Sequence, residues 1–413
     1  MSKTSWKWLR PLVVFLLALI TYAYIAQQFL TGPSVAPYFV SLADSFLHGR
    51  VDIEPSADNL GYDLIHYQDH WYVAQPPLPA LLLMPIVLLR GVGHTSDVAF
   101  NIFLGACSVA LCDIAIGAAV PNCATWKRNW LTLFFGAGTV LVSLSVLGTV
   151  WFMGQVAAAV FTWAFIWMVV SPRPLLAGAM LGLVILGRPF ILPGALVFAG
   201  GYWLWIRRDF WQCRSLRQAV IFFVAPLIIS GTFIGGYNWS RFRNPFDFGY
   251  NYLSDAANIK QRRLTYGIFS PVFLPENLAV AMVNPPVFYA DCSYPLCANI
   301  APDPWGMGLL WTSPLLLYAL LAVPFSNTER HYRYLLAVTI GLVLLPSLLY
   351  HNTGAAQFGY RFALDALPFW IVLLASELAM RWSRAIIAAI LYSVAVNVWG
   401  AYWLINLIVY GHT

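Results

Sequence analysis

The stretch "WLRPLVVFLLALITYAYIAQQFL" (residues 8–30) is apolar over the length that a helix needs to cross a lipid bilayer. It lies behind Lys3 and Lys7, and the apolar part is long and carries no convincing small-x-small cleavage site. We therefore interpret it as an uncleaved first spanning helix whose N-terminus is cytoplasmic. The whole chain has the same character, since 60% of its 413 residues are hydrophobic and 10% are charged. This composition excludes most classes of soluble protein.

About eleven segments approach the ~20 apolar residues that a spanning helix needs. They lie near residues 8–30, 98–119, 130–150, 155–171, 174–187, 189–206, 218–237, 307–325, 334–351, 359–379 and 385–409. The segment "PPLPALLLMPIVLL" (76–89) is shorter and rich in proline, so we expect a juxtamembrane or re-entrant element there. The sequence predicts an all-α polytopic membrane protein that forms a single domain over residues 1–413.

The basic residues test this topology. With the N-terminus inside, every cytoplasmic segment carries Lys or Arg, as the positive-inside rule requires, and these segments hold 14 of the 23 basic residues. They are Lys3, Lys7, Arg10, Lys127, Arg128, Arg173, Arg207, Arg208, Arg214, Arg217, Arg330, Arg333, Arg381 and Arg384. The net charge of +6 therefore reflects membrane topology, and we expect no nucleic-acid partner.

Two large outer loops follow from this topology, at residues 31–96 and 238–306, and we expect juxtamembrane helices in the first. Together they hold 11 of the 17 acidic residues, so acid–base chemistry is expected on the outer face. The acids are Asp44, Asp52, Glu54, Asp58, Asp63, Asp69, Asp247, Asp255, Glu276, Asp291 and Asp303. Asp44 is a candidate for such chemistry because it lies in a short amphipathic segment, "YFVSLADSFLHGR" (38–50), at the membrane surface.

Basic residues in the outer loops are not explained by topology and suit a phosphate, because the guanidinium fork matches phosphate oxygens. They include Arg241, Arg243, Lys260, Arg262 and Arg263, and contact with lipid headgroups is the alternative for each. In "GYRFALDALPFW" (359–370), Arg361 and Asp365 are four residues apart, and both an ion pair and a ligand-binding arginine stay open. His351 and Gln357, in the preceding polar loop, are further candidates for the site.

Cys292 and Cys297 lie in the outer loop within "DCSYPLC", where a small disulfide ring is favoured over two free thiols. No zinc-ligand spacing, P-loop or nucleophile elbow is present in the sequence.

Several short motifs resemble the GT-C superfamily of membrane glycosyltransferases, in particular its family 39 branch of protein O-mannosyltransferase-like proteins. They are "LADSFLHGRVDI", "YQDHWYVAQPPLPALLLMP", "NWSRFRNPFDFGY" and "QFGYRFALDALPF". The resemblance implies transfer of a sugar from a polyprenyl-phosphate donor to an acceptor hydroxyl at the outer membrane face. It also implies a multi-pass protein, which we expect in the bacterial inner (cytoplasmic) membrane. The acceptor, whether glycan, lipid or protein, is open.

The resemblance also implies an essential acid in the first outer loop. Protein O-mannosyltransferases carry adjacent acids where this chain has Val35 and Ala36, so the base must lie elsewhere. Asp44 is the first candidate and Asp52 the second. Pro76 and Pro77 match a Pro-Pro pair of the family and are expected to be architectural.

For the donor phosphate we expect Arg361 first, followed by Arg241, Arg243 and Arg263, with Lys260 and Arg262 as further candidates. No cofactor is predicted, apart from a divalent cation that some members of the superfamily need and others do not.

The main alternative function is a membrane transporter or flippase of lipid-linked or small polar substrates. Such proteins are also polytopic, but they usually place their site at the bilayer midplane in broken helices. The ionisable residues expected within the spans here are few (Asp113, Arg361 and Asp365), and the outer loops are large and acidic. A polymerase or ligase of lipid-linked glycans is a third interpretation. These observations favour the glycosyltransferase.

Overall fold

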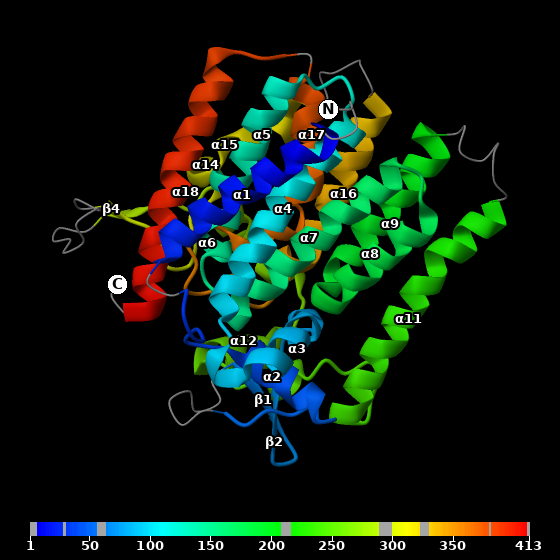
Figure 1. Ribbon diagram of the computed structural model, residues 1–413. Coiled ribbons are helices and arrows are strands. Elements are labelled where there is room, and N and C mark those ends of the chain that lie inside the picture. Colours follow the sequence, from blue (N-terminus) through cyan, green and yellow to red (C-terminus); the bar gives the residue numbers. More distant parts are fainter. Residues whose placement is uncertain are drawn as a thin grey trace.

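The computed structural model describes residues 6–27, 30–55, 63–207, 216–288, 300–322, 330–379 and 381–410. The chain forms a bundle of helices, with a smaller layer of short helices and one β-hairpin (Leu64–Val73) at one end (Figure 1). Cys292 and Cys297 lie outside the described residues, so their pairing stays a prediction.

Seven helical segments in the described part are long and apolar enough to cross a membrane. They comprise α1 (Trp6–Ala26), α4 (Asp97–Ala119), α7 (Val150–Val170), a run from Pro189 to Ile206, α11 (Leu216–Phe242), α16 (Arg330–Leu348) and α18 (Arg384–Tyr410). The run Pro189–Ile206 consists of η4 (Pro189–Ile191), α9 (Leu192–Gly201) and the π-helical turn η5 (Tyr202–Ile206).

The other four predicted spans contain shorter or interrupted helices. These are α5 (Thr125–Ala137) with α6 (Leu141–Ser145), α8 (Pro174–Gly187), α14 (Leu309–Thr312) with α15 (Pro314–Ala322), and η9 (Arg361–Asp365) with α17 (Leu367–Leu378). The break between α5 and α6 falls at Gly138, which ends α5. The prediction of an all-α polytopic membrane protein is confirmed.

Helix α7 forms the centre of the bundle because it is apolar on every side and most of its residues are buried. It packs against α4 and α8, and α8 in turn packs against α11. The last contact is close, since a Cβ on Gly178 would lie 2.1 Å from the Phe223 carbonyl oxygen. Small residues allow this approach between helices in a membrane.

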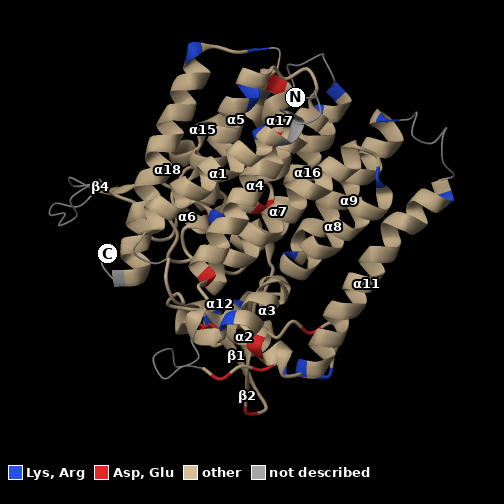
Figure 2. Ribbon diagram, viewed as in Figure 1, with Lys and Arg blue, Asp and Glu red and all other residues tan. Residues whose placement is uncertain are grey.

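Several charged residues inside the bundle are paired. The Asp113 carboxylate lies 2.5 Å from Arg10 and 3.1 Å from Arg128, which joins α4 to α1 and α5. Arg333 of α16 pairs with Glu377 of α17 at 3.1 Å. Lys and Arg mark the ends of several helices at the top of Figure 2, whereas acidic residues gather around α2 and the β1–β2 hairpin at the bottom.

The first large loop contains α2 (Tyr38–Leu47), β1 (Leu64–Tyr67), β2 (His70–Val73), α3 (Leu78–Arg90) and η3 (Val92–His94). Helix α2 buries Phe39, Leu42 and Ala43 against the body of the protein, which leaves Asp44 on its other side. Helix α3 is 13 residues long, so the proline-rich segment forms a short juxtamembrane helix, as expected. Pro77 lies directly before α3, where proline is well tolerated.

The second large loop contains η6 (Tyr250–Tyr252), α12 (Ala257–Tyr266), η7 (Pro271–Phe273), α13 (Leu274–Met282), β3 (Val287–Phe288) and β4 (Ile300–Ala301). Backbone hydrogen bonds connect the two loops: Asp63 N–H donates to Ser254 at 3.1 Å, and Ser254 N–H donates to Leu64 at 3.0 Å. A third segment joins them where His351 N–H donates to Ile268 at 3.0 Å. These bonds bring residues from three distant parts of the sequence together.

Candidate active site

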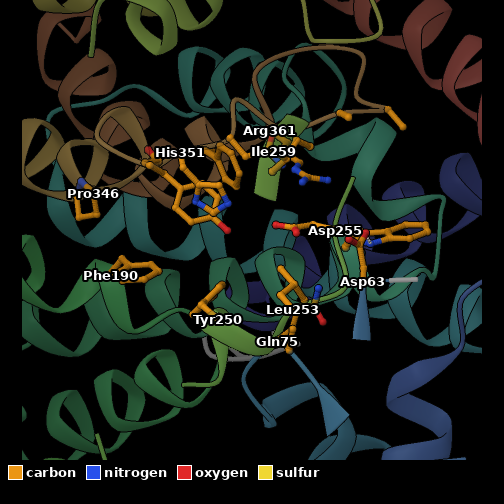
Figure 3. Close-up of a pocket in the computed structure, with 18 of the residues that line it drawn as sticks. Asp63, Gln75, Phe190, Tyr250, Leu253, Asp255, Ile259, Pro346, His351 and Arg361 are labelled. Carbon is orange, nitrogen blue, oxygen red and sulfur yellow. Dashed lines mark hydrogen bonds between the residues drawn. The ribbon is translucent and has the colours of Figure 1, made fainter. Parts of the chain in front are cut away.

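A cavity of about 260 Å³ lies where the two large loops meet the ends of the bundle helices. In the view of Figure 3, the charged residues Asp63, Asp255 and Arg361 lie on one side of it, and Phe190 and Pro346 lie on the other. A lining that combines charged and apolar groups suits a ligand that is partly ionic and partly hydrocarbon.

Asp63 lies directly before β1, and Trp151 at the start of α7 orients its carboxylate. The Trp151 Nε1–H donates to Asp63 Oδ2 at 2.7 Å, which leaves the other oxygen for further contacts. Asp63 has a left-handed backbone with φ of 57°, a conformation that aspartate tolerates better than most residues. Burial raises the pKa of Asp63, the Trp151 hydrogen bond and the Arg361 charge lower it, and the Asp255 charge raises it, with a net increase above the ordinary value of 3.8.

Asp255 is the second carboxylate of the cavity, and Arg263 holds it in place. Arg263 Nη2 donates to both Asp255 oxygens, at 3.0 and 3.2 Å. Arg263 also donates to the backbone carbonyls of Tyr250 and Leu253, so one buried guanidinium fixes the turn that precedes α12. In the structure, Arg263 therefore positions an acid of the cavity.

Arg361 differs from the other arginines around the cavity. Within the described residues it forms no salt bridge, whereas Arg188 and Arg263 pair with Asp365 and Asp255. Its Nε is buried without a hydrogen-bond partner, and its guanidinium lies 5.6 Å from the Phe152 ring centre and 5.2 Å from that of Phe362. The ion pair that the four-residue spacing left open is not formed with Asp365. Asp365 instead binds Arg188, whose Nη2 lies 2.5 Å from Asp365 Oδ2, because Arg361 and Asp365 lie in a 3₁₀ turn and not in an α-helix. Arg361 thus stays available to an anion.

His351 also lines the cavity and is buried, and its Nδ1 has no hydrogen-bond partner. Burial, together with the charge of Arg263, lowers the pKa of His351 to about 4, so the ring is neutral at pH 7. Gln75 Oε1 is a third buried polar atom of the cavity without a partner. These three atoms are free to form hydrogen bonds with a polar ligand in the cavity.

Gln357 has a different position from the one expected. Its Nε2 donates to the carbonyls of Trp305, Thr353 and Gly354, and its Oε1 accepts from the Arg361 N–H at 3.1 Å. All of these partners are backbone groups, so Gln357 supports the loop that carries Arg361 and His351.

Asp44 and Asp52 do not line the cavity. Asp44 is partly exposed on α2 and lies 3.7 Å from His48. Asp52 accepts from His70 of β2 at 3.0 Å, so it connects the segment after α2 to the hairpin. Their catalytic roles stay predictions, but the structure brings neither of them to the acids and arginines described above.

The remaining basic candidates also lie outside the cavity. Arg241 is buried and donates to the Val73 carbonyl at 3.0 Å and to Asn238 at 2.7 Å. Arg262 pairs with Glu276 at 2.6 Å, while Arg243 and Lys260 are exposed. Of the predicted phosphate-binding residues, Arg361 and His351 line the cavity.

Asp63, Asp255 and Arg188 are cavity residues that the sequence did not single out. One signal was present for Asp63, which directly precedes two short segments typical of a hairpin, "LIHY" and "HWYV". No such signal marked Asp255, because its place depends on backbone pairing between loops far apart in sequence. Within the described ranges, no three His, Cys, Asp or Glu side chains come together as a metal site.

Comparison with known proteins gives one informative match. No protein-family model and no curated protein sequence matches the chain. Among solved structures, the crystal structure of ArnT from Cupriavidus metallidurans bound to undecaprenyl phosphate is similar over 99% of this chain and 78% of that one. The TM-score is 0.54 and the sequence identity is 11%. ArnT belongs to the GT-C glycosyltransferases, and the narrower resemblance to family 39 stays a prediction. The chain therefore has a fold similar to that of ArnT.

Proposed function

We propose that this protein is a glycosyltransferase that moves a sugar from a polyprenyl-phosphate donor to an acceptor hydroxyl at the outer membrane face. Arg361 holds the donor phosphate, Asp63 is the general base, and Trp151 orients Asp63. Asp255 and His351 complete the polar wall around the sugar.

The observation that carries this proposal is the unpaired charge of Arg361 beside the Asp63 carboxylate in one cavity. A partly buried cation without an ion-pair partner is unfavourable, and an anion in the cavity would stabilise it. Arg188 and Arg263 are already matched by Asp365 and Asp255. Within the described residues Arg361 forms no salt bridge, and Asp63, the nearby acid whose charge it feels, forms none either. The cavity therefore offers one cation for a phosphate and one acid for a proton.

The reaction follows from this arrangement. An acceptor hydroxyl is a weak nucleophile, and Asp63 takes its proton as the oxygen bonds to the anomeric carbon. The bond between that carbon and the phosphate oxygen breaks, and its electron pair stays on the phosphate. The departing polyprenyl phosphate gains one negative charge, which Arg361 stabilises. The raised pKa of Asp63 makes it a stronger base than an ordinary aspartate.

The surroundings of the cavity support a lipid-linked donor. Phe190 and Phe269, with ring centres 5.3 Å apart, lie on its apolar lining. Phe190 is the second residue of the run Pro189–Ile206, which is apolar enough to cross a membrane. An isoprenoid tail could therefore stay in the bilayer while its phosphate reaches Arg361. The similar fold of ArnT, which was crystallised with undecaprenyl phosphate, is consistent with such a donor.

A transfer assay tests the proposal. The purified full-length protein would be reconstituted in liposomes with radiolabelled undecaprenyl-phosphate hexoses or pentoses and a bacterial membrane extract. We expect label to leave the donor, join another molecule and release undecaprenyl phosphate. Accumulation of intact labelled substrate inside the liposomes, without transfer from any donor, would contradict the proposal and favour the transporter.

A further inference from the structure

A second cleft of about 340 Å³ adjoins the candidate active site. The two share Ile259, His351 and Asn352 in their walls, so the second cleft lies directly beside the proposed place of sugar transfer. Most of the other residues that line it are polar. The polar ones are Asn258, Arg262, Glu276, Asn284, Asp303 and Thr353, and the other two are Val280 and Trp305.

Trp305 is presented at this cleft by a rigid backbone. Its N–H donates to Asp303 Oδ1 at 2.8 Å, and its carbonyl accepts from Gln357 at 2.6 Å. Asn284 stabilises the same turn by donating to Asp303 Oδ2 at 3.0 Å and to the Gly306 carbonyl at 2.8 Å. The Trp305 side chain is nevertheless 44% exposed, although a tryptophan is usually well buried. The turn is fixed on several sides, but part of Trp305 remains exposed at the cleft.

The polar groups of the cleft are held in pairs. Arg262 Nη1 and Nη2 donate to the two oxygens of Glu276 at 3.0 and 2.6 Å, and the Glu276 side chain is half exposed. Each carboxylate oxygen can accept more than one hydrogen bond, so Glu276 and Asp303 retain acceptor capacity. The cleft thus combines one flat aromatic surface with several fixed acceptors and donors.

The geometry points to this cleft as the acceptor subsite, and to a carbohydrate as the acceptor; this inference rests on the proposed function. A sugar ring has a face of C–H bonds that packs on an indole and a rim of hydroxyls that both donate and accept. Trp305 matches the face, while Glu276, Asp303 and the neighbouring amides match the rim. A peptide usually binds by adding a strand to a sheet or by placing apolar side chains in pockets, and this lining fits neither mode well.

The acceptor class is tested with divided extracts. A bacterial membrane extract would be divided into two halves. One half would be digested with protease, and the other would be oxidised with periodate, which destroys sugar diols. We expect transfer of label to survive protease and to be lost after periodate. Transfer that is lost after protease and survives periodate would overturn the inference, since the acceptor would then be a protein.

The role of Trp305 is tested with variants of the full-length protein. Trp305→Ala should raise the KM for the protease-treated acceptor by about tenfold, which is the scale of one aromatic contact. The KM for the donor should not change, and Trp305→Phe should recover most of the acceptor affinity. Trp239→Ala is the matched control, because Trp239 is also exposed but lines neither cavity. An unchanged acceptor KM in Trp305→Ala would overturn the subsite.

Binding of undecaprenyl phosphate separates this inference from the proposed function. If Trp305→Ala binds it as the wild type does and acceptor KM is unaffected, only the subsite is wrong. If the wild type neither binds undecaprenyl phosphate nor transfers sugar, the proposed function is wrong and the subsite falls with it.

Discussion

Asp63→Asn removes the proposed base with little change in shape. The amide oxygen of asparagine can still accept from Trp151 Nε1, which lies 2.7 Å from Asp63 Oδ2 in the native protein. The substitution therefore removes the negative charge and the ability to take a proton, while the orientation of the side chain is kept.

The expected loss in turnover is the contribution of a general base, about 10²–10⁴-fold, or roughly 3–5 kcal/mol in activation free energy. Donor binding should not weaken, because removing a negative charge near Arg361 favours an anionic phosphate. The assay is transfer of label from undecaprenyl-phosphate sugars at saturating donor, with donor affinity measured separately. A fall in turnover without a fall in donor affinity is the expected pattern.

Asp44→Asn and Asp52→Asn are matched controls, since they make the same chemical change outside the cavity. Both should keep turnover within a few-fold of the wild type, because exposed substitutions away from a site have small effects. The assignment of Asp63 is refuted if Asp63→Asn keeps most of its turnover while Asp44→Asn or Asp52→Asn loses it. That outcome would favour Asp44 or Asp52, the two acids predicted from the sequence.

Three further predictions concern charge and stability. The acid limb of the pH–rate profile should lie above the ordinary aspartate pKa of 3.8, because Asp63 must be deprotonated and burial raises its pKa; the limb should vanish in Asp63→Asn. Trp151→Phe should move that limb to higher pH, because the native Trp151 hydrogen bond lowers the pKa of Asp63 and its removal raises that pKa. A shift of the limb to lower pH would contradict this. Asp365→Asn should destabilise the protein by about 3–5 kcal/mol, because it leaves Arg188 without its partner; unfolding in detergent no different from that of Asp44→Asn would count against it.

The length of the apolar segments and the placement of charge predicted the fold well, because the bilayer constrains both. A spanning helix needs a long apolar run, and basic residues collect on one side of the membrane. The proline-rich segment 76–89 was too short to span, and it forms the 13-residue helix α3. Length and composition are local properties, so the sequence carries them directly.

The site was harder to predict because it depends on contacts between distant segments. Arg361 and His351 could be chosen from their place beside a span, and both line the cavity. Asp63 and Asp255 meet because their backbones pair through Ser254 and Leu64, which no spacing in the sequence reveals. Asp365 forms its ion pair with Arg188, which is 177 positions away in the sequence.

The central claim is that Arg361 holds a polyprenyl phosphate in this cavity, and binding of undecaprenyl phosphate to the purified protein tests it most directly. Each charge-assisted hydrogen bond contributes about 1.5–3 kcal/mol, so loss of one or two should weaken binding by roughly 10²-fold or more. We predict this loss for Arg361→Met and near-native binding for Arg243→Met, whose exposed arginine lies outside the cavity. Equal binding by the wild type and Arg361→Met would contradict the account.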